Sequence, residues 1–331
     1  MATKNLSHLC LLLAAACAPA LAVGAPLPLK LVSDAPLTGG TTRFDYESLD
    51  ARDGRLFIAH LGDSTVTVFD TAANKVIQDI GEVGHVHGVL VVPELDRVYA
   101  SATQTDEVVA IDPHSLKIIA RMAGGDYPDG MAYAPPVHRL YVSDEHGATE
   151  TVIDTDTNTR IATLPLGGEV GNTQYDPVSG HIFANVQTRE DLVEIDPKTD
   201  QIVARYPLPG AKGNHGLLID TDDHLAFIAC EDNDKLLVLD MRSMKLVSSF
   251  DVGGDPDVLA MDLGLHRFYV AGEKGVVSVF GITNGKVTHL GDGLVGGNAH
   301  VVAVDARSHR VYFPLKDEGG KPVMRIMEPN N

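Results

Sequence analysis

An aromatic residue recurs in one short context along most of the chain, at intervals of 42 to 44 residues. Each copy lies in a β-branched stretch such as RLFIAH, RVYASA or RLYVSD, and the seven aromatic residues are Phe57, Tyr99, Tyr141, Phe183, Phe227, Tyr269 and Tyr312. A fixed period of this length is typical of repeat architectures, in which each unit buries its apolar face against the next. The sequence therefore predicts seven similar units.

The pattern inside each repeat predicts four strands. An apolar run such as GMAYAPP precedes the aromatic stretch, a third run ends in VFD, AID or EID, and a fourth run such as KIIARM follows after a turn. Short β-branched runs at about ten-residue spacing, bounded by turn residues, indicate strands. No stretch has a helical period long enough to compete. Four strands per repeat make one propeller blade, so we expect an all-β, seven-bladed β-propeller.

The two ends of the repeat region predict how the ring closes. The last repeat ends at PVMRIMEPNN, after its third strand, while the run PLKLVSD precedes the first repeat and has no partner in it. We expect this N-terminal strand to complete the seventh blade, because that arrangement removes an open sheet edge. Residues 26–331 are then one propeller domain.

The first 25 residues have the pattern of a secretory signal peptide. One lysine precedes an apolar stretch too short for a membrane span, and small residues follow that allow cleavage after Ala22 or Ala25. No later segment has the apolar length of a membrane helix, so we expect a periplasmic protein without membrane insertion. Cleavage would leave Cys230 as the only cysteine, which excludes an internal disulfide. A lone cysteine at a strand end is best explained as a small buried side chain.

The chain is strongly acidic. Its 26 Lys and Arg residues against 45 Asp and Glu residues give a formal charge of −19. Such a surface repels phosphate backbones, which argues against a nucleic-acid partner, and its mean field attracts cations. We expect a monomer whose partner is a small-molecule ligand or another periplasmic protein.

The repeat strands also resemble a known family. The stretches RVYASA, RLYVSD and HRFYVAG, together with the blade openings GDYPDGMAY and GGDPDVLAMD, look like those of the YncE-like, YVTN-repeat propellers of bacterial periplasms. The resemblance covers all seven repeats. It implies a seven-bladed propeller that binds a ligand or a partner protein, whereas two neighbouring propeller groups, the lactonases and the streptogramin-lyase-like proteins, are enzymes.

One position in the repeat carries the candidate site. The residue twelve places before each aromatic residue falls at the head of the innermost strand, which lines the channel of a propeller, and these residues are Asp45, His87, Asp129, Gly171, His215, Asp257 and His300. Carboxylates crowded at one level repel one another unless a cation compensates them. Imidazole and carboxylate together suit Zn, Cu, Fe or Mn. We therefore predict that Asp45, His87, His215 and His300 hold a divalent transition metal, with a polar channel lining as the alternative.

Two functions remain open at this point. The first is a binding propeller that holds a metal ion, a small ligand or a partner at this channel. The second is a metal-dependent hydrolase or lyase acting on a lactone-like substrate, in which His85, Asp129 or Asp257 would move the proton. The lactonase propellers bind calcium without imidazole, which favours binding, while streptogramin-lyase-like propellers do use a channel histidine.

Overall fold

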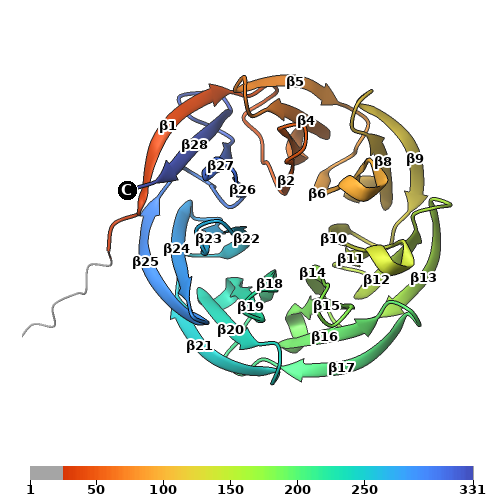
Figure 1. Cartoon of the computed structure of the whole chain (residues 1–331). Coiled ribbons are helices and arrows are strands. Elements are labelled where there is room, and N and C mark those ends of the chain that lie inside the picture. Colours follow the sequence, from red (N-terminus) through yellow and green to blue (C-terminus); the bar gives the residue numbers. More distant parts are fainter. Residues whose placement is uncertain (1–24, 331) are drawn as a thin grey trace, which may run out of the picture.

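The computed structural model describes residues 25–330 of the 331-residue chain. The predicted signal peptide, apart from Ala25, lies outside the described residues. The remainder forms seven antiparallel sheets of four strands each, arranged in a ring (Figure 1). The prediction of an all-β, seven-bladed propeller is confirmed.

Each of the first six blades consists of four consecutive strands. Blades one to three are β2 (Glu47–Asp50), β3 (Arg55–His60), β4 (Thr65–Asp70) and β5 (Lys75–Ile80); β6 (Val86–Val92), β7 (Arg97–Ala102), β8 (Glu107–Asp112) and β9 (Lys117–Ala123); and β10 (Pro128–Ala134), β11 (Arg139–Asp144), β12 (Thr149–Asp154) and β13 (Thr159–Pro165). Blades four to six are β14 (Val170–Asp176), β15 (His181–Val186), β16 (Asp191–Asp196) and β17 (Gln201–Pro207); β18 (Asn214–Asp220), β19 (Leu225–Cys230), β20 (Lys235–Asp240) and β21 (Lys245–Asp251); and β22 (Pro256–Asp262), β23 (Arg267–Gly272), β24 (Val276–Thr283) and β25 (Lys286–Leu294).

Blade seven joins the two ends of the described chain. It contains β26 (Ala303–Asp305), β27 (Arg310–Leu315), β28 (Val323–Pro329) and, as its outermost strand, β1 (Leu29–Pro36). β1 runs antiparallel to β28 from the Leu29–Pro329 pair to the Pro36–Val323 pair (Figure 1). The predicted closure by the N-terminal strand is confirmed.

Within residues 25–330, short 3-10 turns connect strands in six places. They are η1 (Leu61–Asp63), η2 (Pro93–Leu95), η3 (Thr103–Thr105), η4 (Pro135–Val137), η5 (Gln187–Arg189) and η6 (Glu231–Asn233). Each is three residues long and ends at a residue in the left-handed conformation. No helix among the described residues has the length and apolar character of a membrane span.

The hydrophobic core lies between neighbouring blades. One cluster joins Phe57 of blade one to Val98 of blade two, and another joins Phe227 of blade five to Phe268 of blade six, whose rings stack at 4.0 Å. The recurring aromatic residue of every repeat is buried in this way. The period of about 42 residues therefore arises because each blade packs its aromatic residue against the next blade.

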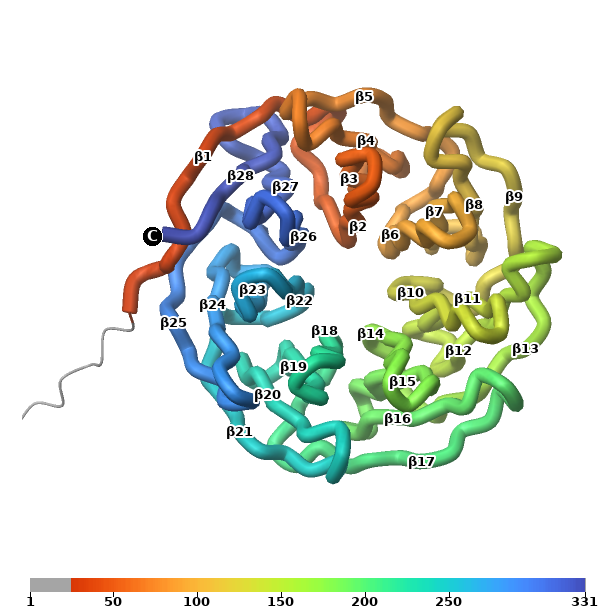
Figure 2. The backbone as a smooth tube through the Cα atoms, in the orientation of Figure 1, coloured from red at the N-terminus to blue at the C-terminus, as the bar shows by residue number. Residues whose placement is uncertain are grey.

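The innermost strands surround the centre of the ring (Figure 2). In blades two to six the pairing between the first two strands slips at a β-bulge just after the first strand begins, for example between Val86 and Val89 of β6. Glycine lies in four of these bulges, and at two of them the next blade leaves no room for a side chain. A Cβ at Gly88 or Gly216 would lie 2.1 Å from a backbone carbonyl oxygen of the next blade. These close approaches bring the channel residues of adjacent blades together.

Candidate ligand site in the central channel

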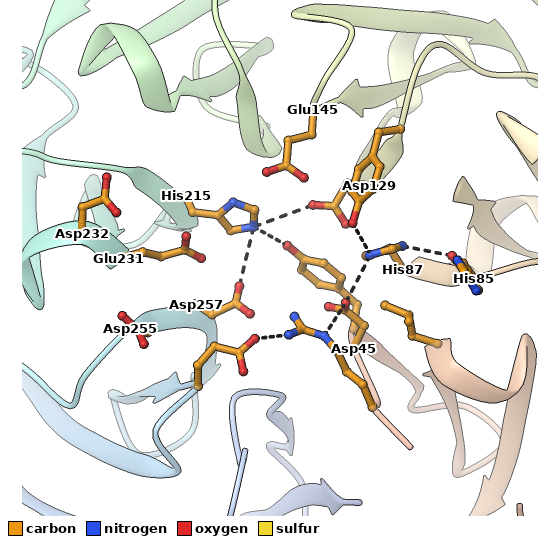
Figure 3. Close-up of a pocket in the computed structure, with 15 residues that line it drawn as sticks. Asp45, His85, His87, Asp129, Glu145, His215, Glu231, Asp232, Asp255 and Asp257 are labelled. Carbon is orange, nitrogen blue, oxygen red and sulfur yellow. Dashed lines mark hydrogen bonds and ion pairs between the residues drawn. The ribbon is translucent and has the colours of Figure 1, made fainter. Parts of the chain in front are cut away.

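The ring position predicted from the repeat converges on one cavity at the channel mouth (Figure 3). The cavity has a volume of about 510 Å³, and its lining includes Asp45, His87, Asp129, His215 and Asp257. Gly171 has no side chain to contribute, and His300 lies behind the lining, 3.9 Å from Asp257 Oδ2. Six of the seven blades thus place an acid or an imidazole at or next to this cavity.

The structure corrects the expected position of two of these residues. In blades two, three, five and six the channel residue lies in the innermost strand, but Asp45 and His300 precede the regular strands β2 and β26. Asp45 keeps its place at the channel because its N–H donates to the carbonyl of Ala59 in β3, at 2.9 Å. The hydrogen bonding of the blade thus extends past the regular strand.

The residues two places before the channel residues lie outside the innermost strands. Five of them have left-handed backbone conformations, with φ between 45° and 62°: His85, Tyr127, Gly213, Asp255 and Asn298. The chain turns at these positions, so the alternation of a strand does not extend to them. His85, a predicted proton carrier, is exposed at the rim of the cavity.

Carboxylates outnumber fixed positive charges in the cavity. Its lining contains eight, from Asp45, Asp129, Glu145, Glu231, Asp232, Asp255, Asp257 and Glu273, against the single guanidinium of Arg43. Arg43 forms ion pairs with Asp45, at 3.4 Å, and with Glu273. Repulsion and burial are therefore only partly compensated by the protein itself.

Burial and the neighbouring charges shift the pKa values of the groups around the cavity. Burial raises the pKa of Asp129 to about 6 and that of Asp257 well above its ordinary value. Burial alone would lower the pKa of His215, but the charges of Glu231, Asp257 and Asp129 outweigh it and raise that pKa to about 9. His215 is therefore an imidazolium at neutral pH. Burial lowers the pKa of His300, which keeps its ring neutral.

Tyr46 was not found from the sequence, and it divides the channel. From blade one its hydroxyl reaches His215 Nε2 of blade five, at 3.0 Å, and accepts a hydrogen bond from Asn172 Nδ2 of blade four, at 2.7 Å. Tyr46 and Asp257 also line a second cavity of about 340 Å³ on the other side. The side chain of Tyr46 thus separates the acidic cavity from the rest of the channel. Glycine occupies the same repeat position in blades two, three and five. The only signal for Tyr46 in the sequence is therefore that a large side chain stands where three other blades have glycine.

Tyr127 is the hydrogen-bond partner of His87, as Tyr46 is of His215. Thr103 donates its hydroxyl proton to the carbonyl of Pro128, at 2.7 Å, so the proton on His87 Nδ1 points to Thr103 Oγ1, at 2.8 Å, and to the carbonyl of His85, at 3.0 Å. His87 Nε2 is bonded to the Tyr127 hydroxyl at 3.0 Å. Both ring nitrogens of His87 therefore have partners.

The four predicted metal ligands do not form one cluster. Within the described residues, two groups bring three ligand atoms to within 4.8 Å of one another: Asp45, Asp257 and His300, and His215, Glu231 and Asp257. His87 Nε2 lies 3.8 Å from Asp45 Oδ2 but belongs to neither group. Asp257, predicted as a proton carrier, is common to both. Asp257 therefore connects the two groups.

Comparison with known proteins defines the fold but no family. No family model and no curated protein matches the chain. Among solved structures, a chain of hydrazine synthase from Kuenenia stuttgartiensis is 14% identical, with a TM-score of 0.74 over 89% of this chain and 97% of that one. Virginiamycin B lyase from Staphylococcus aureus is 12% identical, with a TM-score of 0.74 over 90% and 99%. The WD40 repeats of RRP9 are 11% identical, with a TM-score of 0.76 over 91% and 100%. At these identities the likeness is one of fold, and propellers host unrelated functions.

Proposed function

We propose that this chain is a binding propeller of the periplasm that captures a cation, either a divalent transition metal or a small organic cation, in the acidic cavity of its channel. The location rests on the signal-peptide pattern and on the resemblance to YncE-like propellers. The ligand class rests on one observation, which is that eight carboxylates line a cavity to which Arg43 brings one guanidinium and His215 one imidazolium.

The shape of the cavity supports capture from one side. Tyr46 lines both the acidic cavity and the second cavity, whereas Glu145, Glu231 and Glu273 line only the acidic one, so a ligand held by these glutamates lies on one side of Tyr46. A site enclosed by low-dielectric walls of one charge sign concentrates ions of the opposite sign. A cation bound there would replace the missing positive charge and lower the cost of the buried carboxylates.

A calorimetric titration of the mature protein tests this proposal. We expect Zn²⁺, Mn²⁺ or a diamine such as putrescine to bind, and acetate to give no signal. A ligand at one hundred times its Kd should stabilise the fold by about 2.7 kcal/mol. The variant Glu145→Gln/Glu231→Gln should weaken binding at least tenfold. Glu94→Gln/Glu190→Gln, which removes two exposed carboxylates outside the cavity, is the matched control. Equal binding by both variants would contradict the proposal.

A second candidate function is the hydrolase or lyase, and one observation favours it. His215 Nε2 lies 3.7 Å from Asp129 Oδ2, and their environments push the two pKa values to about 9 and about 6. A neutral-range carboxylate beside an imidazolium is the pairing that base and acid catalysis requires. Asp129 would accept a proton from the substrate while His215 donates one to the leaving oxygen.

A screen of lactones and cyclic esters separates the two functions. Catalysis predicts turnover that is lost in Asp129→Asn, with a pH profile that rises near pH 6. The absence of turnover by a protein that binds cations would leave only the binding function.

A further inference from the structure

His300 differs from the other two channel histidines in its hydrogen bonding. His300 Nδ1 lies 3.0 Å from the carbonyl oxygen of Asn298, and because a carbonyl only accepts, Nδ1 carries the ring proton. His300 Nε2 has no hydrogen-bond partner among the described residues, although the residue is only 1% exposed. A buried acceptor left without a donor is destabilising, so this nitrogen requires an explanation.

The side chains around that nitrogen are mainly carboxylates, which the guanidinium of Arg43 compensates only in part through its ion pairs with Asp45 and Glu273. His300 Nε2 lies 3.9 Å from Asp257 Oδ2 and 3.7 Å from Glu273 Oε1. Asp45, Asp257 and His300 each offer one ligand atom, and these three atoms lie within 4.8 Å of one another. Asp257 Oδ1 also lacks a hydrogen-bond partner. These nitrogen–oxygen distances are too long for hydrogen bonds. A lone pair pointing at carboxylates is repelled unless a cation lies between them.

We propose that Asp45, Asp257 and His300 bind one transition-metal dication, and that His87 and His215 support the site without coordinating the ion. This inference rests on the proposed function and names its ligand class. It keeps Asp45 and His300 of the ligand set expected from the repeat and replaces the other two histidines by Asp257.

The distances suit such an ion. Zn²⁺ bonds to imidazole nitrogen and carboxylate oxygen are about 2.0 to 2.2 Å long, so two ligand atoms in a tetrahedral site lie about 3.4 Å apart. The 3.9 Å separation of His300 Nε2 and Asp257 Oδ2 would therefore close by roughly half an ångström on binding. The Asn298 carbonyl holds the ring of His300 through Nδ1, which is the usual outer contact of a metal-binding histidine. One imidazole with two carboxylates favours Zn²⁺, Fe²⁺ or Mn²⁺ over Ca²⁺, which prefers oxygen ligands alone.

The Nε2 atoms of the other two histidines already have hydrogen-bond partners. His87 Nε2 is bonded to Tyr127 and His215 Nε2 to Tyr46, each at 3.0 Å (Figure 3). Coordination through either Nε2 atom would break its hydrogen bond with a tyrosine hydroxyl. We therefore assign these two rings to positioning: His87 lies against Asp45 and His215 against Asp257, at 3.8 and 3.6 Å.

Metal analysis of purified variants tests the assignment. We expect the parent, dialysed after exposure to Zn²⁺ or Mn²⁺, to retain about one equivalent, and His300→Ala and Asp257→Asn to bind at least tenfold more weakly. His87→Gln and the surface control His138→Ala should retain the ion. Near-ultraviolet circular dichroism of each variant establishes that it is folded. If His300→Ala does not fold, His300→Gln replaces it. Electron paramagnetic resonance of bound Mn²⁺ gives an independent readout that does not depend on yield.

The possible outcomes separate this inference from the proposed function. Undiminished metal binding by folded His300→Ala, or loss in His87→Gln equal to that in His300→Ala, would overturn the ligand assignment and leave cation capture intact. Binding of putrescine without any metal would do the same. Failure of the parent to bind metals and amines alike would overturn both.

Discussion

Glu150 should destabilise the propeller, and replacing it by leucine should stabilise the fold by an amount that grows with pH. The residue is fully buried in β12, and both carboxylate oxygens lack hydrogen-bond partners. The nearby hydroxyl of Thr173 donates instead to the carbonyl of Phe183, at 3.2 Å. The corresponding residues of the neighbouring blades are Val108 and Leu192, both buried, so leucine suits this position.

The size of the effect has two parts. Removing an unpaired buried polar group should contribute about 1 to 3 kcal/mol at any pH. Burial also raises the pKa of Glu150 well above its ordinary value, so the folded state holds a proton that the unfolded state releases above about pH 4.3. The folded protein then binds more protons, and its free energy of unfolding falls by about 1.4 kcal/mol per pH unit until the pKa of the folded state is reached. This second part grows with pH for as long as the pH stays below the raised pKa of the folded state.

Urea denaturation of the parent and Glu150→Leu at pH 5, 6 and 7 measures both parts. Far-ultraviolet circular dichroism and tyrosine fluorescence should give coincident transitions, so that a free energy is defined. The stability difference should be positive at pH 5 and larger at pH 7. Glu94→Leu, at an exposed position, should change stability by less than about 0.5 kcal/mol at every pH. A Glu150→Leu variant less stable than the parent, or a difference independent of pH, would refute the reasoning.

Three further changes test other parts of the structure. Tyr46→Phe should cost about 1 to 3 kcal/mol, seen as a lower Tm, because it removes the hydroxyl that pairs with His215 and Asn172; an unchanged Tm would contradict that pairing. Cys230 should not react with a thiol reagent in the folded protein at pH 8 but should react in urea, since burial raises its pKa to about 12; rapid native labelling would contradict this. Deleting residues 25–36, which removes β1, should abolish cooperative unfolding, as blade seven would lose its outer strand; a cooperative melt like that of the parent would refute this role of β1.

Much of the fold was predictable because packing between blades imposes the repeat. Each blade buries its aromatic residue against its neighbour, as Phe227 does against Phe268, so the same residue type is needed every 42 to 44 positions. The unpaired strand at the N-terminus followed from counting strands at both ends. The ring of channel residues was accessible by the same argument, since a fixed offset from a buried aromatic residue is a fixed place in the blade.

The geometry of the site was not predictable from that offset. The repeat places Asp45, His87, His215 and His300 at one level, but it does not report how far each side chain reaches or what it meets. Two tyrosines outside the ring position occupy nitrogens of His87 and His215. The left-handed turn at Tyr127 directs its side chain, and that backbone conformation has no periodic signal in the sequence.

Departures from the repeat carry most of the chemistry. A perfectly repeated blade would line the channel with seven identical residues, and seven equal charges at one level would repel one another. The chain instead alternates acids with imidazoles and leaves Gly171 without a side chain. It also places Tyr46 where three other blades have glycine. Since interblade packing already stabilises the ring, single positions at its centre can depart from the repeat at small cost to the fold. We therefore expect substitutions at Asp257 and His300 to change ligand binding more than stability, and substitutions at Phe57 or Tyr141 to do the reverse.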